Sequence, residues 1–194
     1  MSDKTIDRQL ILASGSKRRS EILSLLDIPF STCTPDVDET FIGTDAEKNC
    51  MRIAKLKANL VAGCTPNSIV ISADTIISTD GKIMGKAESR NDAREMLLSF
   101  SGNVHRVYTG FCVSDTSSGF NHSGYDVTEV LFEEMNTRDI EWYLDTQEWL
   151  GVAGAYRIQE AGACFIKSIT GSYYTVMGLP IHRIYGILRQ INFI

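Results

Sequence analysis

Two arginines follow a run of small polar residues in the segment SGSKRR at 14–19, directly after a short apolar run. If a helix begins there, its N-terminus offers unpaired N–H groups and a partial positive charge, and the small residues let an anion approach closely. The guanidinium groups of Arg18 and Arg19 carry forked donors that match phosphate oxygens in pairs. A serine helix cap followed by a solvated basic turn explains the spacing equally well. Cations beside a helix N-terminus oppose its dipole, so we favour an anion bound between the arginines and the helix.

Carboxylates form a second group. Asp36, Asp38 and Glu39 lie in one short stretch, and Asp74 follows the apolar run SIVISA. An acid at the carboxyl end of a strand emerges where open α/β sheets bind their ligands. Two or three carboxylates together with phosphate oxygens suit Mg²⁺, which keeps several waters and few protein ligands. Taken alone, the short stretch is better explained as solvated surface, and a turn cap explains Asp74 as well as a functional role does.

A lysine shares the apolar side of a predicted helix. Lys57 lies at helical spacing from the apolar residues Cys50, Ala54 and Val61, whereas Lys55 points away from that side. The ordinary fate of such a lysine is to pack its stem and extend its ammonium group to water. The alternative is that Lys57 points into a cleft, where it pairs with a phosphate or a carboxylate.

Two glycine-rich, aromatic segments lie near the C-terminus, GAYRIQEAG at 154–162 and GSYYTVMGLP at 171–180. Such segments can be hairpin turns and core, or they can line a site. Gln159 in the first segment carries an amide that both donates to and accepts from a base edge. His105 is better explained as a core histidine that satisfies a hydrogen bond than as a catalytic base.

The composition is that of an ordinary globular protein. The chain has 194 residues, 43% of them hydrophobic and 22% charged, which excludes a disordered chain. At this length we expect a single domain over residues 1–194. The net charge of −5 argues against a protein that coats a nucleic-acid backbone, and no apolar run approaches the ~18 residues that span a membrane. The five scattered cysteines form no CxxC pair, and the acid-containing N-terminus lacks the pattern of a secretory signal. A reducing, cytoplasmic setting is therefore expected.

Strands and helices alternate along the chain. The predicted strands are 10–13, 30–34, 68–75, 76–78 paired with 82–84 through the turn Asp80-Gly81, 104–114, 124–132, and the hairpin-like pair 163–169 and 172–176. Helices are predicted at 16–26 and at 44–61, the second with a capping box from Thr44 to Glu47. Ser89 begins another helix, and Thr137 caps a short one. The last predicted helix begins at Pro180 and buries Ile181, Ile184, Tyr185 and Leu188. At least two links are hairpins, so we expect one α/β unit, of one or two lobes, with a mixed sheet.

Eight short segments, in the same order and over nearly the whole chain, resemble motifs of the Maf family of nucleoside triphosphate pyrophosphatases, once described as septum-formation inhibitors. The segments are LASGSKRR at 12–19, VDE at 37–39, AKLKA at 54–58, ADT at 73–75, GK at 85–86, SGNVHRVYTG at 101–110, GAYRIQ at 154–159 and GSYYTVMGLP at 171–180. Each motif is short, but the ordered set is highly specific.

The resemblance implies an α/β fold with a mixed, elongated sheet flanked by helices and a cleft between two lobes. It also implies a cytoplasmic hydrolase that cuts a nucleoside triphosphate between its α- and β-phosphates and releases the monophosphate and pyrophosphate. The implied cofactor is a divalent metal cation, Mg²⁺ or Mn²⁺. The implied partner is the nucleotide substrate, without nucleic acid or membrane, and a homodimer is consistent with the family.

The family's site residues map onto this chain by position. Asp74 matches the general base, and Glu39 together with Asp74 matches the metal-site acids. The positions linked to substrate choice are Arg18, Thr75 and Gln159. The polar residues that match the phosphate region are Ser14, Ser16, Arg19, Lys57 and Lys86. Departures from the usual pattern are Lys17 and Ala87, where the family has Pro, and Glu160, where it has Gly.

Gln159 in its GAYRIQ context resembles the branch of the family that acts on dTTP and UTP, whereas the 7-methyl-GTP branch tends to carry Glu there. A neutral amide complements the O4 and N3–H edge of thymine or uracil, and a carboxylate better suits the N1–H and amino group of guanine. A pyrophosphatase for 7-methyl-GTP or for modified nucleotides in general is one alternative. Another is a non-catalytic nucleotide-binding regulator of septum formation. The regulator would not need the acids, so the presence of both Glu39 and Asp74 favours catalysis.

Overall fold

The structure of the protein is a computed structural model that describes residues 8–194. The expectation about a secretory signal, and the start of the expected domain, fall in part on residues 1–7, which lie outside the described residues. Within residues 8–194, no helix is both long enough and apolar enough to cross a membrane.

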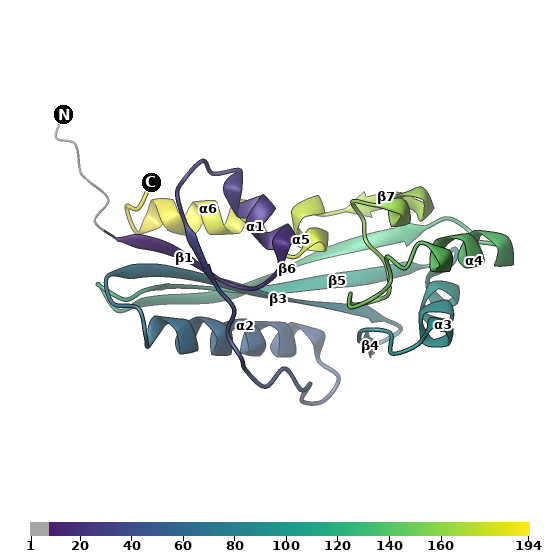
Figure 1. Cartoon of the computed structure of the whole chain (residues 1–194), viewed down its shortest axis with the longest axis horizontal. Coiled ribbons are helices and arrows are strands. Elements are labelled where there is room, and N and C mark those ends of the chain that lie inside the picture. The colour runs from purple at the N-terminus through teal and green to yellow at the C-terminus, as the bar shows by residue number, and fades with distance from the viewer. Residues whose placement is uncertain (1–7) are drawn as a thin grey trace.

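Within residues 8–194, a mixed seven-stranded sheet runs along the molecule (Figure 1). The strand order is β2-β1-β3-β5-β6-β7, and β4 pairs with β3 beside this path. β1 is parallel to both of its neighbours, and the other pairings are antiparallel, which confirms the predicted mixed sheet. The strands are β1 (Gln9–Ala13), β2 (Ser31–Cys33), β3 (Ser68–Thr79), β4 (Lys82–Met84), β5 (Val104–Asp115), β6 (Phe120–Phe132) and β7 (Ile166–Thr170).

Helices cover both faces of this sheet. Figure 1 shows α2 along one face, α1, α5 and α6 over the other, and α3 and α4 together at one end of the elongated molecule. The helices are α1 (Lys17–Ser24), α2 (Ala46–Ala62), α3 (Arg90–Phe100), α4 (Thr137–Asp145), α5 (Tyr173–Met177) and α6 (Ile181–Gln190), with a 3₁₀ helix, η1, at Ala161–Phe165.

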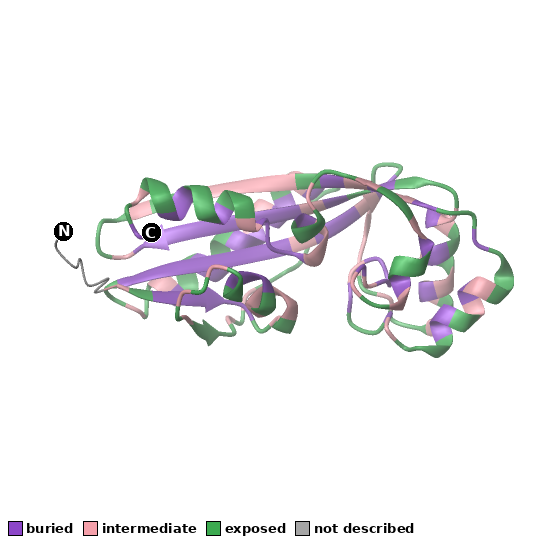
Figure 2. Cartoon of the chain, turned by 90° about the horizontal axis from the view of Figure 1, so that it is seen from above, coloured by how far each residue is buried: buried purple, intermediate pink, exposed green. Residues whose placement is uncertain are grey.

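In the part of the chain that the structure describes, the buried apolar side chains form two main cores, one in each lobe. One core lies between α3, α4 and the segment around η1 and includes Phe100 and Tyr143. The other lies between β1, α1 and α6 and includes Leu12 and Leu23. The long strands β3 and β5 contribute side chains to both cores. Figure 2 shows buried strands running between the exposed outer faces of the helices. The predicted fold, a mixed sheet flanked by helices with two lobes, is thus confirmed.

Gly110 of β5 lets α2 lie directly against the sheet. A Cβ atom at this position would meet the backbone of α2 at 2.3 Å from the carbonyl carbon of Cys50. Any side chain there would push the helix away. Because α2 carries Lys57 two turns further on, this close approach sets the depth at which that lysine meets the sheet.

Two helix caps differ from the prediction by one residue. Asp45, not Thr44, caps α2, and its Oδ1 accepts a hydrogen bond from the N–H of Lys48 at 3.0 Å. Asn136, not Thr137, caps α4 and forms a reciprocal capping box with Asp139. In each case the stronger cap residue lies beside the predicted one, and a carboxylate also complements the positive end of α2.

The prediction of a strand at 172–176 is wrong. It forms the short helix α5, preceded by η1 and by β7, which begins only at Ile166. The carbonyl oxygen of Thr175 accepts a hydrogen bond from the hydroxyl of Thr109, and the N–H of Ser172 donates to the hydroxyl of Thr128. These tertiary contacts prevail over the β-propensity of the tyrosine, threonine and valine side chains. In α6, Tyr185 is exposed rather than buried, whereas Ile184 and Leu188 are buried as predicted.

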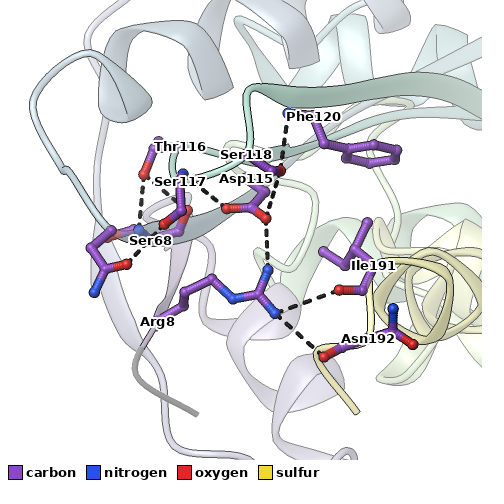
Figure 3. Close-up of polar contacts among 10 residues, drawn as sticks. Arg8, Ser68, Asp115, Thr116, Ser117, Ser118, Phe120, Ile191 and Asn192 are labelled. Atoms are coloured by element: carbon purple, nitrogen blue, oxygen red, sulfur yellow. Dashed lines mark hydrogen bonds and ion pairs between the residues drawn. The ribbon is translucent and has the colours of Figure 1, made fainter.

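A polar cluster ties both ends of the described chain to the sheet (Figure 3). Arg8 forms an ion pair with Asp115 at 2.6 Å and donates to the backbone carbonyl of Asn192 at 3.3 Å. Asp115 also accepts from the hydroxyl of Ser118 in the turn between β5 and β6. The cluster joins the start of β1, that turn and the end of α6, and so closes one end of the sheet.

His105 lies in one of the two cores, as the sequence predicted. It is 1% exposed, its Nε2 lies 2.8 Å from the hydroxyl of Tyr156, and its ring stacks on Phe100. Burial lowers the pKa of His105 to about 4. The unfolded chain, with an ordinary histidine pKa near 6.5, therefore binds the proton first as the pH falls.

We expect His105 to make stability fall between pH 6.5 and 4, the window between these two pKa values. Urea titrations across this window should show a loss in the free energy of unfolding of about 3 kcal/mol from this residue. The variant His105→Gln should lose this part of the pH slope, whereas His182→Gln, on the exposed side of α6, should keep it. An unchanged slope in His105→Gln would contradict the assignment.

Candidate active site

A cleft of about 680 Å³ lies between the two lobes and opens along one edge of β3. β1 pairs with β3 only as far as Ile71, and β4 pairs with it only from Ile77 onward. Between these partners, on the edge opposite β5, Asp74 and Thr75 face the cleft. Asp74 therefore lies within a strand, not at its carboxyl end as predicted, because the strand continues to Thr79.

The cleft brings all of the expected site residues together. They come from the β1–α1 turn, the start of α1, the β2–α2 loop, α2, β3, the segment after β4 and the segment before η1. The residues that line it are Ser14, Ser16, Arg18, Arg19, Glu39, Lys57, Asp74, Thr75, Lys86 and Gln159. Asp36 and Asp38 are exposed and do not line the cleft, which fits the solvated-surface interpretation for that part of the loop.

The turn from β1 into α1 is held by two serines. Ser14 Oγ accepts a hydrogen bond from the N–H of Ser16 at 3.1 Å. Ser16 is the N-cap of α1, and its Oγ accepts from the N–H of Arg19 at 3.5 Å. The first turn of α1 contains no acid. The positive end of the helix dipole therefore faces the cleft without a carboxylate in the first turn of α1 to offset it.

Arg19 is anchored on three sides. Its Nε donates to the carbonyl oxygen of Gly178 at 2.8 Å, its Nη1 to Ser14 Oγ at 3.4 Å and its Nη2 to Thr75 Oγ1 at 3.3 Å. Burial lowers the pKa of Arg19, and the charge of Asp74 partly offsets that effect. A guanidinium has five N–H groups, so two remain for a ligand oxygen.

Gly178 makes this anchoring possible. It ends α5 in the left-handed conformation with φ of 106°. A Cβ atom there would lie 3.1 Å from Thr75 Oγ1 and 3.3 Å from Arg19 Nε, inside the hydrogen-bonded group. Glycine is thus required both by the backbone angle and by the close approach of the arginine.

Lys57 joins the two acids at the centre of the cleft. Its Nζ lies 2.8 Å from Asp74 Oδ1 and 2.7 Å from Glu39 Oε1. Lys57 and Asp74 are 6% and 8% exposed, so the lysine is buried and paired and does not extend to water. Of the two alternatives left open by the sequence, the structure therefore supports the one in which Lys57 points into a cleft and pairs with carboxylates.

The two carboxylates are tuned in opposite directions. Burial raises the pKa of Asp74, and the charges of Lys57 and Arg19 oppose the rise. For Glu39, partial burial acts in the same upward direction, but the hydrogen bond and charge of Lys57 prevail and lower its pKa. A carboxyl with a raised pKa is a better proton acceptor at neutral pH than an ordinary one. Asp74 is therefore the better base of the pair.

Two further arginines, Arg18 and Arg157, also line the cleft. Burial lowers the pKa of Arg18, and the nearby charge of Arg157 lowers it further. Arg157 was not among the residues expected in the site; it pairs with Glu160 at 3.3 Å. The sequence feature that could have indicated Arg157 as a site residue is its position in GAYRIQ, two residues before Gln159. The amide nitrogen of Gln159 lies 3.5 Å from Glu160 Oε1.

The donor set at the centre suits a hard divalent cation that binds together with a polyphosphate. No group of three or more His, Cys, Asp or Glu side chains within residues 8–194 forms a metal site by itself. Glu39 and Asp74 come within reach of one ammonium group, so their oxygens converge. Mg²⁺ is commonly held by one or two carboxylates, with phosphate oxygens and water completing its shell.

Comparisons with known proteins cover nearly the whole chain. Residues 9–191 match the family model described as "Maf-like protein". A dTTP/UTP pyrophosphatase of Bacillus cytotoxicus is 40% identical over 186 residues, which are 95% of this chain and 96% of that protein. A dTTP/UTP pyrophosphatase of Bacillus cereus strain AH187 is 40% identical over 188 residues, with the same coverage. The solved structure of the Staphylococcus aureus Ham1 protein covers 66% of this chain and 73% of its own, with a TM-score of 0.47 and 16% identity.

Proposed function

The chain belongs to the Maf family, and on this premise we propose that it is a nucleoside triphosphate pyrophosphatase acting on dTTP and UTP. It would cut the bond between the α- and β-phosphates and release the monophosphate and pyrophosphate. The proposal rests on one observation: the buried carboxylate of Asp74, whose pKa is raised, and several cationic side chains converge in one cleft. The names of the two Bacillus relatives support the choice of nucleotides.

Asp74 is proposed as the general base. Its carboxylate orients a water molecule and takes a proton as the water oxygen forms the new bond to phosphorus. The bond between that phosphorus and the α–β bridging oxygen breaks, and the bridging oxygen leaves with its electron pair. The raised pKa of Asp74 supports this role, because proton transfer is most efficient when the base titrates close to the working pH.

The cationic groups are proposed to bind the triphosphate. Arg19, Ser14 and Ser16 lie at the N-terminus of α1, and Lys57 and Lys86 line the same cleft. Such groups position the chain of phosphates and stabilise the charge that develops as the bond breaks. A divalent cation, Mg²⁺ or Mn²⁺, would be held by Glu39 and Asp74 and would neutralise charge on the phosphate oxygens.

Gln159 is proposed to select the nucleobase of the substrate, with Arg18 and Thr75 as the further specificity residues. We also propose that residues 1–194 act as one domain, since β3 and β5 belong to both cores. The five cysteines are free thiols, which supports the proposed cytoplasmic location. A homodimer is part of the proposal on family grounds alone.

A substrate panel tests the proposed function. The purified protein is incubated with Mg²⁺ or Mn²⁺ and each of dTTP, UTP, 7-methyl-GTP, the remaining common triphosphates and modified pyrimidine nucleotides, and released pyrophosphate is measured. The highest kcat/KM values should belong to dTTP and UTP. Preference for 7-methyl-GTP, or equal rates across the panel, would contradict the proposed specificity. Tight binding without turnover on any nucleotide would instead identify a nucleotide-binding regulator.

The variant Gln159→Glu tests the base contact. Its carboxylate only accepts hydrogen bonds, so it should no longer complement the acceptor and donor pair of thymine. We expect the ratio of kcat/KM for dTTP to that for 7-methyl-GTP to fall by about tenfold or more. The control Gln190→Glu makes the same chemical change at the exposed end of α6 and should leave the ratio unchanged. An unchanged ratio in Gln159→Glu would remove Gln159 from base selection.

A further inference from the structure

A chain of hydrogen bonds leads from the cleft into the middle of the sheet. Arg19 Nη2 donates to Thr75 Oγ1 at 3.3 Å, and the hydroxyl oxygens of Thr75 and Thr109 lie 3.0 Å apart. Thr109 Oγ1 in turn donates to the carbonyl oxygen of Thr175 at 2.7 Å. Thr109 is fully buried, pairs directly with Thr75 in the β3–β5 ladder, and is not one of the residues that line the cleft.

The carbonyl oxygen at the end of the chain fixes the direction of every hydrogen bond in it. A carbonyl only accepts, so the single hydroxyl proton of Thr109 is used on Thr175. Thr109 Oγ1 must then accept from the hydroxyl of Thr75. With its proton directed into the sheet, Thr75 presents only lone pairs toward the cleft, and Arg19 donates to one of them.

On the basis of the proposed function, we propose that Thr109 is a positioning residue, which turns the Thr75 hydroxyl into an acceptor and thereby fixes the guanidinium of Arg19 for binding the triphosphate. Without the Thr109 hydroxyl, the Thr75 proton has to find another acceptor. The hydroxyl is then free to rotate and to turn its proton toward the guanidinium, where donor meets donor. Arg19 loses one of its three anchors and the spread of its orientations increases.

The competing explanation is that Thr109 only anchors α5 to the sheet. Thr128 of β6 provides a matched control for it. Thr128 is also fully buried, and its hydroxyl bonds both the carbonyl oxygen and the N–H of Ser172, the N-cap residue directly before α5. It therefore anchors the same helix from the next strand, without a bond to Thr75 or Arg19 among the described residues.

The test compares Thr109→Val, Thr109→Ser and Thr128→Val, each checked for folding and for its free energy of unfolding. Both valine variants remove one buried hydroxyl and should lose comparable stability. We expect Thr109→Val to lower kcat/KM for dTTP about tenfold, the scale of one hydrogen bond to a charged group. Thr109→Ser, which keeps the hydroxyl, should restore most of this loss, and Thr128→Val should keep the wild-type value.

A double-mutant cycle with Thr75→Val shows whether Thr109 acts through Thr75. In the Thr75→Val background there is no Thr75 hydroxyl to orient, so adding Thr109→Val should cause no further loss of kcat/KM. An additive loss, an equal loss in Thr128→Val, or a wild-type value in Thr109→Val would each overturn the proposal.

Calorimetric titration with inorganic pyrophosphate keeps this test separate from the proposed function. Pyrophosphate should bind to the wild-type protein and, with the same affinity, to Thr128→Val. Its affinity for Thr109→Val should be about tenfold lower. If no nucleotide is hydrolysed, the proposed function fails, and these affinities still decide the role of Thr109. If the wild-type protein does not bind pyrophosphate, or all three bind it equally, the positioning role is wrong.

Discussion

Replacing Asp74 with Asn is expected to lower kcat for dTTP by about 10²–10⁴-fold, the range for loss of a general base. The amide keeps the size of the carboxylate and can still accept a hydrogen bond from Lys57, so the fold should be retained. What it loses is the ability to take a proton from water and the negative charge. Steady-state kinetics on protein with a native circular dichroism spectrum measures the effect.

The pH dependence of the same pair of proteins separates the two losses. Because burial raises the pKa of Asp74, the carboxylate is protonated, and kcat/KM falls, at a pH above the ordinary aspartate range. The wild-type profile should therefore show an acid limb that is absent from the residual activity of Asp74→Asn. The control Asp36→Asn, in the exposed part of the β2–α2 loop, should keep both the rate and the limb. Near-normal turnover in Asp74→Asn would remove Asp74 from its role.

Replacing Lys57 with Met is expected to produce the second large effect, a loss of about 10²–10³-fold in kcat/KM. The ammonium is proposed to bind the triphosphate, and it also pairs Asp74 with Glu39 across the cleft. Its charge opposes the rise in the pKa of Asp74. Without it, that pKa should rise further, so the acid limb of the pH profile should move to higher pH.

The matched control for this variant lies two residues away on α2. Lys55 is exposed, and Lys55→Met should leave both the rate and the acid limb in place. Removing one partner of a buried ion pair can cost about 3–5 kcal/mol, so both variants are compared at a temperature where each is fully folded. An acid limb that stays where it is in Lys57→Met would show that Lys57 does not act on Asp74.

Much of the site could be predicted because its chemistry is encoded in short segments. Helical spacing alone placed Lys57 on the buried side of its helix, and the SGSKRR turn was correctly expected at the start of α1. Lys86 came from a family motif alone, whereas Gln159 was indicated first by the amide that it offers to a base edge and then by its place in a family motif. The mixed sheet followed from the hairpin signals, since a tight turn such as Asp80-Gly81 forces an antiparallel pairing.

The rest depends on contacts between residues far apart in the chain. Nothing near Thr109 indicates that its hydroxyl meets Thr75, because the pairing of β5 with β3 brings them together. Arg157 and Arg18, which are far apart in the chain, both line the cleft and lie close enough for their charges to interact. The helix α5 forms where propensity favours a strand, since its carbonyl and cap groups find partners in β5 and β6. Such outcomes are decided by tertiary hydrogen bonds that no local pattern records.

The products of dTTP hydrolysis show which bond the protein cuts and whether Asp74 carries the reaction. Wild-type protein and Asp74→Asn are incubated with dTTP and Mg²⁺, and the products are separated by ion-exchange chromatography. We expect dTMP and pyrophosphate in equal amounts, formed at least about 10² times faster by the wild-type protein. Formation of dTDP and inorganic phosphate would show that another bond is cut, and equal rates in the two proteins would show that Asp74 is not the general base.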